Sequence, residues 1–276
     1  MATIEKITHL DVSEVADYLA GSFGVDREIP ARKLRWASER GYDNLGYMLK
    51  HDGDVVGAFL ATYGDTPSGK KICHLDWWHV HEDFRRFSIP LFRALLQQDV
   101  DGFTDYTPQP HVRPINKRLG FRDLDTRAIR IWNLRLPQLR SGIRITTNPS
   151  RISPLLDGRE LRLFEDHRFV PGIGHLAIRD DGGNVCVVAF RRVSGRTTRV
   201  RILYVSNQAM FRRYAANIFW RLAIQHRSLF TVAELRVIGR PFALARRAPA
   251  VWRQYKSEAI PETELGELYS PLIWSS

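Results

Sequence analysis

The sequence contains little cysteine, and neither of its two cysteines belongs to a recognisable metal-binding or redox motif. Cys73 and Cys186 each lie within an apolar run, and neither is accompanied by a CxxC pair or by Cys and His at the spacing of zinc ligands. We therefore expect two reduced, buried thiols and no metal.

Long apolar runs and nucleotide-binding or hydrolase motifs are also missing. No stretch approaches the roughly 18 uncharged apolar residues that a membrane helix needs, and Glu5 and Lys6 interrupt the N-terminus where a signal peptide would be apolar. The segment Gly172-Ile173-Gly174 lacks the third glycine of a dinucleotide fingerprint, and no Gly-Lys-Ser/Thr or Gly-x-Ser-x-Gly loop occurs. The lack of a long apolar run and of a signal peptide predicts a soluble, cytoplasmic protein without a membrane partner.

Lysine is scarce as well, although the chain is strongly basic. The formal net charge is +11, and only seven of the 41 basic residues are lysines. Residues 1–135 hold 19 basic and 19 acidic residues, whereas residues 136–276 hold 22 and 11, so all of the excess lies in the second half. An arginine-rich surface suits phosphates and carboxylates, so either an anionic ligand or a merely solvated basic surface explains it.

What is present is 276 residues with 44% apolar content, enough for one large domain or two of about 140 residues. In the first half, periodicity and turn residues predict the element order ααβββαβαβ. The expected elements are helices at 11–22 and 31–39, strands at 45–50, 55–63 and 71–79, a helix at 90–99, a strand at 103–107, a helix at 112–118, and a hairpin or bent strand at 121–134.

The second half repeats this order after a predicted linker. Phe84-Arg85-Arg86-Phe87 and the apolar helix that follows match Phe211-Arg212-Arg213-Tyr214 and its helix at a constant offset of 127, and chance similarity of two amphipathic helices is the alternative explanation. The repeat predicts a duplicated domain, with lobes at 1–135 and 153–276 and a linker at 136–152. The second series comprises a helix at 153–167, strands at 175–179, 185–192 and 198–205 with a turn at Ser194-Gly195, a helix at 210–226 and a strand at 231–237.

The first half resembles the GNAT superfamily of acyl-CoA N-acyltransferases. In that family a strand ending in Val leads into a Gln/Arg-x-x-Gly-x-Gly/Ala loop and a helix, and here Val80 is followed by Arg85-Arg86-Phe87-Ser88-Ile89-Pro90. The segment from Asn116 to Phe121, Asn-Lys-Arg-Leu-Gly-Phe, resembles the family's Tyr-x-Lys-Leu-Gly-Phe signature. The resemblance implies an α/β (α+β) fold of two GNAT-like lobes, each with a central mixed, mostly antiparallel sheet flanked by helices.

The resemblance also implies an acyl-CoA co-substrate, acetyl-CoA or a longer thioester, whose pyrophosphate binds the loop amides at the helix N-terminus. Both glycines of the loop are replaced here, by Ser88 and Pro90, and proline removes one amide. The second lobe keeps every amide at the matching place and offers a second anion site. The expected coenzyme-binding residues are Val80, Arg85, Arg86, Phe87, Ser88, Ile89 and Asn116, and the second-lobe anion-binding candidates are Arg212, Arg213, Ala215 and Asn217.

Acyl transfer to an amine requires a base, and in the family this is commonly a carboxylate on the strand before the loop. The corresponding position is His74, and Asp76 lies on the same face of a strand with period two, so both are candidate catalytic residues. A buried structural histidine and a locally paired aspartate are the alternative reading. The family's tyrosine, which would serve as the general acid, aligns with Asn116. The amide of Asn116 can donate a hydrogen bond, but it cannot supply a proton to the leaving group.

Three functions fit these features. The leading hypothesis is an N-acyltransferase that acts on a small-molecule or protein amine. Tandem relatives that use aminoacyl-tRNA suggest a second enzyme, which would bind RNA, although a nucleic-acid partner is not favoured. The third is a non-catalytic GNAT-like protein that binds an acyl-CoA or a metabolite.

Overall fold

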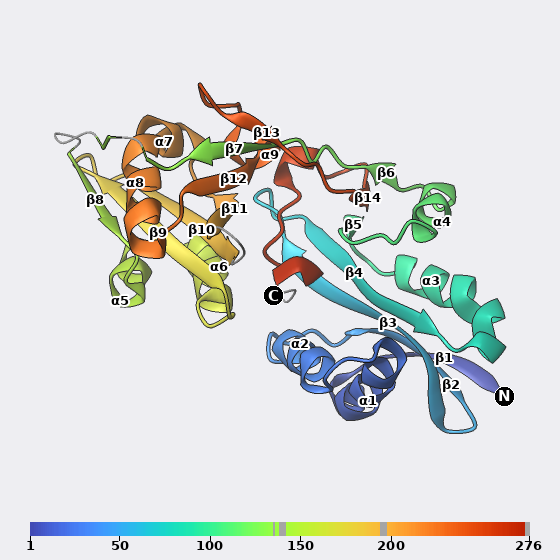
Figure 1. Ribbon diagram of the computed structural model, residues 1–276. Helices are drawn as coiled ribbons and strands as arrows, with labels where there is room; N and C mark the ends of the chain where they lie inside the picture. Colours follow the sequence, from blue (N-terminus) through green and yellow to red (C-terminus); the bar gives the residue numbers. More distant parts are fainter. Residues whose placement is uncertain (135, 138–141, 194–197, 274–276) are drawn as a thin grey trace. The chain divides into compact units, whose positions relative to one another are not determined.

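The computed structural model describes residues 1–134, 136–137, 142–193 and 198–273, which form two compact units (Figure 1). Unit 1 contains Met1–Leu124, Trp252–Leu265 and the described residues from Tyr269 onward. Unit 2 contains Asp125–Val251 and Gly266–Leu268.

Among the described residues, unit 1 is built on a sheet of seven strands in the order β1-β2-β3-β4-β5-β14-β6 (Figure 1). Neighbouring strands are antiparallel except β4 and β5, which are parallel. The strands are β1 (Ala2–Lys6), β2 (Gly46–His51), β3 (Asp54–Asp65), β4 (Lys71–Val80), β5 (Gly102–Asp105), β6 (Arg122–Asp123) and β14 (Gln254–Lys256).

Helices cover both faces of this sheet (Figure 1). On one face, apolar side chains of α3 and α4 join the core formed by Phe59, Cys73 and Leu75. On the other face, α1 and α2 pack against β3 and β4. The bounds are η1 (His9–Asp11), α1 (Val12–Phe23), α2 (Glu28–Ser38), η2 (Glu82–Phe87), α3 (Ser88–Leu96), α4 (Val112–Arg118), η4 (Glu262–Glu264) and η5 (Pro271–Ile273).

Unit 2 has the same topology. Its seven described strands follow the order β8-β9-β10-β11-β12-β7-β13, again with one parallel pair, β11 and β12, at the matching place. Its elements are β7 (Ala128–Trp132), β8 (Ile143–Thr146), α5 (Pro149–Ile152), η3 (Ser153–Leu155), α6 (Gly158–His167), β9 (Ile173–Asp180), β10 (Val185–Val193), β11 (Arg199–Val205), α7 (Gln208–Arg213), α8 (Ala215–His226), β12 (Phe230–Glu234), α9 (Leu235–Ile238) and β13 (Arg246–Ala248).

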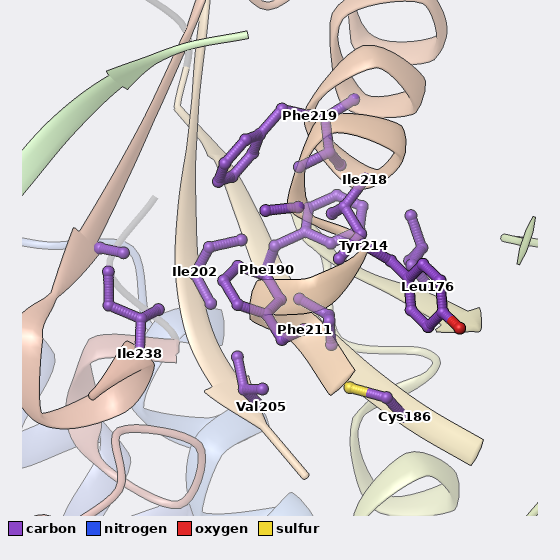
Figure 2. Close-up of a cluster of buried hydrophobic side chains, with 14 of the residues drawn as sticks. Leu176, Cys186, Phe190, Ile202, Val205, Phe211, Tyr214, Ile218, Phe219 and Ile238 are labelled. Atoms are coloured by element: carbon purple, nitrogen blue, oxygen red, sulfur yellow. The ribbon is translucent and has the colours of Figure 1, made fainter. Parts of the chain in front are cut away.

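The main core of unit 2 lies between its sheet and the α7–α8 segment (Figure 2). Phe211 and Phe219 pack edge to face with 5.9 Å between ring centroids, and both are fully buried beside Phe190 of β10. Cys186 lies at the edge of this cluster, and Cys73 is equally buried in unit 1, so both thiols are free and inaccessible as expected.

Each sheet includes a strand from a distant part of the chain, so the division into units differs from the predicted lobes at 1–135 and 153–276. After β6 the chain leaves unit 1, and β7 pairs with β12 and β13 of unit 2. The gap between β5 and β6 is filled by β14, whose Gln254 is fully buried and donates to Asp123 Oδ1 at 3.1 Å. The predicted linker at 136–152 is also shorter than expected, because it contains β8 and α5.

The local elements are otherwise close to those expected from the sequence. The elements β1, β8, α9, β13 and β14 have no counterpart in the predicted series, and the predicted helix at 210–226 is divided at Tyr214 into α7 and α8. The predicted turn at Ser194-Gly195 lies outside the described residues. None of the helices in the described ranges is long and apolar enough to cross a bilayer.

A candidate acyl-transfer cleft in unit 1

A cleft opens in unit 1 where β4 extends beyond its parallel neighbour β5. The two strands pair only from Ile72 with Gly102 to Leu75 with Asp105, and β4 then continues to Val80 (Figure 1). Beyond Leu75, no other strand in the described part of the chain pairs with β4 on this side. The cleft has a volume of about 730 Å³.

The walls of the cleft come from five parts of unit 1. β4 and β3 form the floor, α1 and the start of α3 form two sides, and the chain from the end of β5 into α4 forms the third. The lining residues are Phe23, Phe59, Leu75, Asp76, Trp77, Trp78, His79, Val80, Arg85, Ser88, Ile89, Asp105, Thr107, Pro108, Gln109, His111, Val112 and Ile115.

A β-bulge at Trp77 determines which side chains face which side. Phe59 pairs with Trp78 and Leu60 pairs with Asp76, so Trp77 has no partner on β3, and its φ is +44°. The extra residue shifts the alternation of the strand by one. Trp78 therefore joins Leu75 on the α3 side, stacked on Phe59 at 5.1 Å, while His79 joins Asp76 on the side of α1 and α2.

The predicted catalytic residue Asp76 lines the cleft, but its carboxylate is already engaged. It forms an ion pair with Lys33 of α2, and the two side chains are only 5% and 3% exposed. The pair therefore fastens α2 to β4 at the base of the cleft, and we assign Asp76 a structural role.

The other predicted catalytic residue, His74, does not reach the cleft. It is 2% exposed, and its Nδ1 lies 2.6 Å from the hydroxyl of Thr104, its partner in the β4–β5 register. Burial, with the nearby Lys33 charge, lowers the pKa of His74 to about 3. The imidazole is neutral and inaccessible, which matches the alternative reading of a satisfied core histidine.

The predicted phosphate loop is a 3₁₀ helix rather than an open turn. Residues Glu82–Phe87 form η2, which runs directly into α3, and the amide of Ser88 donates to the carbonyl of Arg85. Pro90 has no amide to offer. Fewer free N–H groups therefore face the cleft than a helix N-terminus normally presents.

The coenzyme-binding candidates of this segment divide into two groups. Val80, Arg85, Ser88 and Ile89 line the cleft, whereas Arg86 and Phe87 are not among the lining residues. The Arg86 guanidinium instead lies over the ring of Phe87, 5.0 Å from its centroid.

Asn116 is not a coenzyme contact, contrary to the prediction. Its side chain is fully buried and donates to Asp105 Oδ2 at 2.9 Å and to Gln254 Oε1 at 3.0 Å. It therefore joins α4 to β5 and β14 behind the wall of the cleft. Only Ile115 and the first residue of the helix, Val112, represent α4 among the lining residues.

The second-lobe anion candidates are also occupied or buried. Arg212 donates to the carbonyls of Ile238 and Arg240, the latter at 2.6 Å, and stacks over Phe242. Ala215 is 5% exposed, and α7 continues through Tyr214 into α8.

The remaining two candidates do not form a site with Arg212 either. The Arg213 guanidinium lies 5.4 Å from the centroid of the Tyr214 ring, and Asn217 also has an interaction partner. The predicted anion site is thus not assembled from these four residues.

Buried charges occupy the region of unit 2 where β11 and β12 part. Arg201 Nη2 lies 2.6 Å from Glu234 Oε1 and 2.9 Å from Glu267 Oε1, and Arg236 Nε lies 2.6 Å from the other Glu234 oxygen. Glu234 and Glu267 are nearly inaccessible. This network anchors the segment Gly266–Leu268 within unit 2. The position in unit 2 that corresponds to the cleft of unit 1 therefore has a structural function.

Several cleft residues were not identified as functional from the sequence. Phe23, Asp105 and His111 line the cleft, but no sequence pattern indicated them. Phe23 reaches the cleft because α1 packs on β4, where its ring lies 4.8 Å from that of Trp77. Such contacts depend on packing between distant segments and leave no local pattern.

The strand order and the single parallel pair, which both units share, define two lobes of the GNAT fold. Similar solved structures include a GCN5-related N-acetyltransferase from Anabaena variabilis, with 11% identity over 92% of this chain and 72% of that one and a TM-score of 0.62. A probable N-acyltransferase from Enterococcus faecalis gives 12% identity, the same coverage and a TM-score of 0.60.

A putative acetyltransferase from Pyrococcus horikoshii is similar over 97% of this chain and 92% of its own length, with 13% identity and a TM-score of 0.50. At these identities the likeness concerns the fold. The sequence itself matches no protein-family profile and no curated protein.

Proposed function

We propose that the protein is an acyl-CoA-dependent N-acyltransferase that transfers an acyl group to an amine in the cleft of unit 1. The observation that carries the proposal is the cleft itself, which opens beside the free edge of β4 in a fold shared with acetyltransferases. Acetyl-CoA or a longer acyl-CoA is the co-substrate, and a small molecule or a protein supplies the amine.

The free edge of β4 suits an extended ligand that carries amides. Beyond Leu75 the outer N–H and C=O groups of the strand face the cleft without a partner strand in the described residues. A pantetheine arm contains two amides and can hydrogen-bond to such an edge as an added strand does. Trp78, Ile89 and Ile115 supply apolar walls for its methyl groups.

The phosphates of the coenzyme would lie toward η2 and α3. Arg85 lines the cleft there, and its side chain is 70% exposed, so its guanidinium is available to pair with a phosphate despite its contact with Glu82. Because Ser88 N–H is engaged and Pro90 lacks an amide, side-chain charge carries more of the phosphate binding than in a glycine-rich loop. Arg85 is therefore expected to matter more than the helix dipole.

Unit 2 serves as a structural partner in this proposal. Its candidate anion-binding arginine, Arg212, holds the backbone of the loop after α9, and the Arg201–Glu234 ion pair occupies the place where its parallel strands diverge.

Isothermal titration with acetyl-CoA and octanoyl-CoA tests the proposal, with thiol release followed in parallel. Wild-type protein should bind a thioester at micromolar concentration, and Arg85→Ala should weaken binding about tenfold or more, the effect of losing a charge-assisted hydrogen bond. Arg213→Ala is the matched control, because this exposed arginine occupies the position in unit 2 that corresponds to Arg86, and binding should be unchanged.

Failure of every thioester to bind would refute the proposal. Salt-dependent RNA binding would then support the aminoacyl-tRNA alternative. Tight thioester binding without thiol release, across a range of amines, would instead identify a non-catalytic binding protein.

A further inference from the structure

His79 lines the cleft from β4. The bulge at Trp77 turns it toward α1, where its ring lies 5.7 Å from both Tyr18 and Phe23. Without the bulge, strand alternation would direct His79 into the core beneath α3.

The hydrogen bonds around Tyr18 determine which ring nitrogen of His79 carries the proton. The Tyr18 hydroxyl lies 2.9 Å from the carbonyl of Val56 and 2.8 Å from His79 Nδ1. A carbonyl can only accept, and the hydroxyl has one hydrogen. Both contacts are satisfied together only when Tyr18 donates to Val56 and His79 Nδ1–H donates to Tyr18.

This arrangement leaves His79 Nε2 unprotonated. Within the described residues, Nε2 makes no hydrogen bond, and the side chain borders the cleft. An oriented imidazole with one nitrogen fixed by a hydrogen bond and the other facing a substrate site is the usual arrangement of a general base.

We propose that His79 is the general base of acyl transfer and that Tyr18 is the residue that positions it. The proposal rests on the function proposed above for the same cleft. In the step, the neutral amine nitrogen attacks the thioester carbonyl, a C–N bond forms, and one N–H proton passes to His79 Nε2. The C–S bond breaks, the thiolate takes a proton from solvent, and His79 returns its proton to solvent.

The protonation states agree with these roles. Burial lowers the pKa of His79, and the Coulombic effects of His81 and Arg85 act in the same direction, so the imidazole is neutral at pH 7. Burial raises the pKa of Tyr18, which therefore keeps its hydrogen for Val56. Tyr18 of α1, His81 after β4 and Arg85 of η2 are the titratable or charged groups that act on His79 among the described residues.

The other titratable groups of the cleft are less suited to the task. Asp76 is paired with Lys33. Asp105 is 8% exposed and accepts from Asn116 and from the amide of Thr107 at 3.2 Å, so both of its oxygens are occupied. His111 lines the cleft, but its ring makes no hydrogen bond within the described ranges that would orient either nitrogen.

Nitrogen-15 NMR of protein labelled at histidine tests the contact between His79 and Tyr18, and it needs no amine substrate. His79, assigned by its loss in His79→Gln, should be the Nδ1–H tautomer at neutral pH, and Tyr18→Phe should convert it to a mixture of tautomers. Addition of acetyl-CoA should shift the Nε2 signal. An Nε2–H tautomer in the wild type, or a tautomer indifferent to Tyr18→Phe, would overturn the assignment.

Kinetics separate this inference from the proposed function. Thiol release from acetyl-CoA is measured with spermidine and tyramine as acceptors, or with water if neither reacts. His79→Gln should bind acetyl-CoA as the wild type does but lower turnover by about 100-fold, the lower range of general-base contributions. Tyr18→Phe should lower turnover less and displace the acidic limb of the pH–rate profile, a change that mere loss of packing would not produce.

The control is His9→Gln, an exposed histidine outside the cleft, which should leave turnover unchanged. If acetyl-CoA binds and His79→Gln retains turnover within threefold, only the base assignment fails. If no acyl-CoA binds the wild type, the proposed function fails and the base assignment falls with it.

Discussion

Replacement of Lys33 by methionine should destabilise unit 1 strongly. Lys33 and Asp76 are both almost inaccessible, and the uncharged methionine side chain would leave the Asp76 carboxylate buried without its cation. Breaking one side of a buried ion pair typically costs about 3–5 kcal/mol. With a denaturant slope of about 2 kcal/mol per M in urea, the unfolding midpoint of unit 1 should fall by about 2 M.

Urea unfolding followed by tryptophan fluorescence measures this effect. The double replacement Lys33→Met with Asp76→Leu should recover most of the loss, because a well-packed apolar pair substitutes for buried charges at little cost. Lys50→Met is the matched control, since Lys50 pairs with Glu14 at a site that is 23% and 41% exposed, and its effect should be below about 1 kcal/mol. A midpoint shift below about 0.5 M for Lys33→Met, or no recovery in the double variant, would refute the reasoning.

Three further outcomes follow from other buried groups. Asn116→Leu should destabilise unit 1 by about 1–3 kcal/mol, because Asp105 loses a donor, and thermal unfolding measures it. Glu267→Gln should cost unit 2 a similar amount through weaker bonds to Arg201, with urea unfolding as the readout. Because the folded-state pKa of His74 is near 3, His74 contributes full stability above the unfolded pKa of about 6.5 and loses about 1.4 kcal/mol per pH unit as pH falls toward 3. Unfolding at pH 7 and pH 5 should show a smaller difference in His74→Gln than in the wild type, and an unchanged difference would contradict this account.

Much of the fold could be predicted from the sequence because it depends on local patterns. The turn at Asp52 and Gly53 has positive φ at both residues, a conformation that an Asp-Gly pair tolerates, and it joins β2 to β3. The repeat at offset 127 correctly relates η2 and α3 to α7 and α8, since each pair follows the fourth strand in the order of its sheet.

The placement of β14 in the sheet of unit 1 and of β7 in the sheet of unit 2 could not be predicted in this way. β14 has three residues, too few to show a period, and its place depends on the buried contacts of Gln254 with Asn116 and Asp123. β7 is fixed in unit 2 by Asn133, which accepts from Thr231 at 2.7 Å. Pairings between residues more than 90 positions apart leave no trace in a local window.

The position of the candidate site was predicted from the sequence better than the identity of its catalytic residues. Val80, Arg85, Ser88 and Ile89 do line the cleft, because the end of a strand and the start of a helix are readable from sequence. Period-two alternation correctly placed His74 and Asp76 on one face of β4. No sequence pattern predicted the bulge at Trp77 that brings His79 to that face.

Amide hydrogen exchange with and without acetyl-CoA tests the central claim most directly. The account predicts that acetyl-CoA slows exchange in β4 over residues 77–80, where outward N–H groups have no partner strand and can donate to the ligand, and leaves β11 of unit 2 unchanged. Slower exchange in β11 instead of β4, or no change in either strand at a saturating concentration of acetyl-CoA, would contradict it.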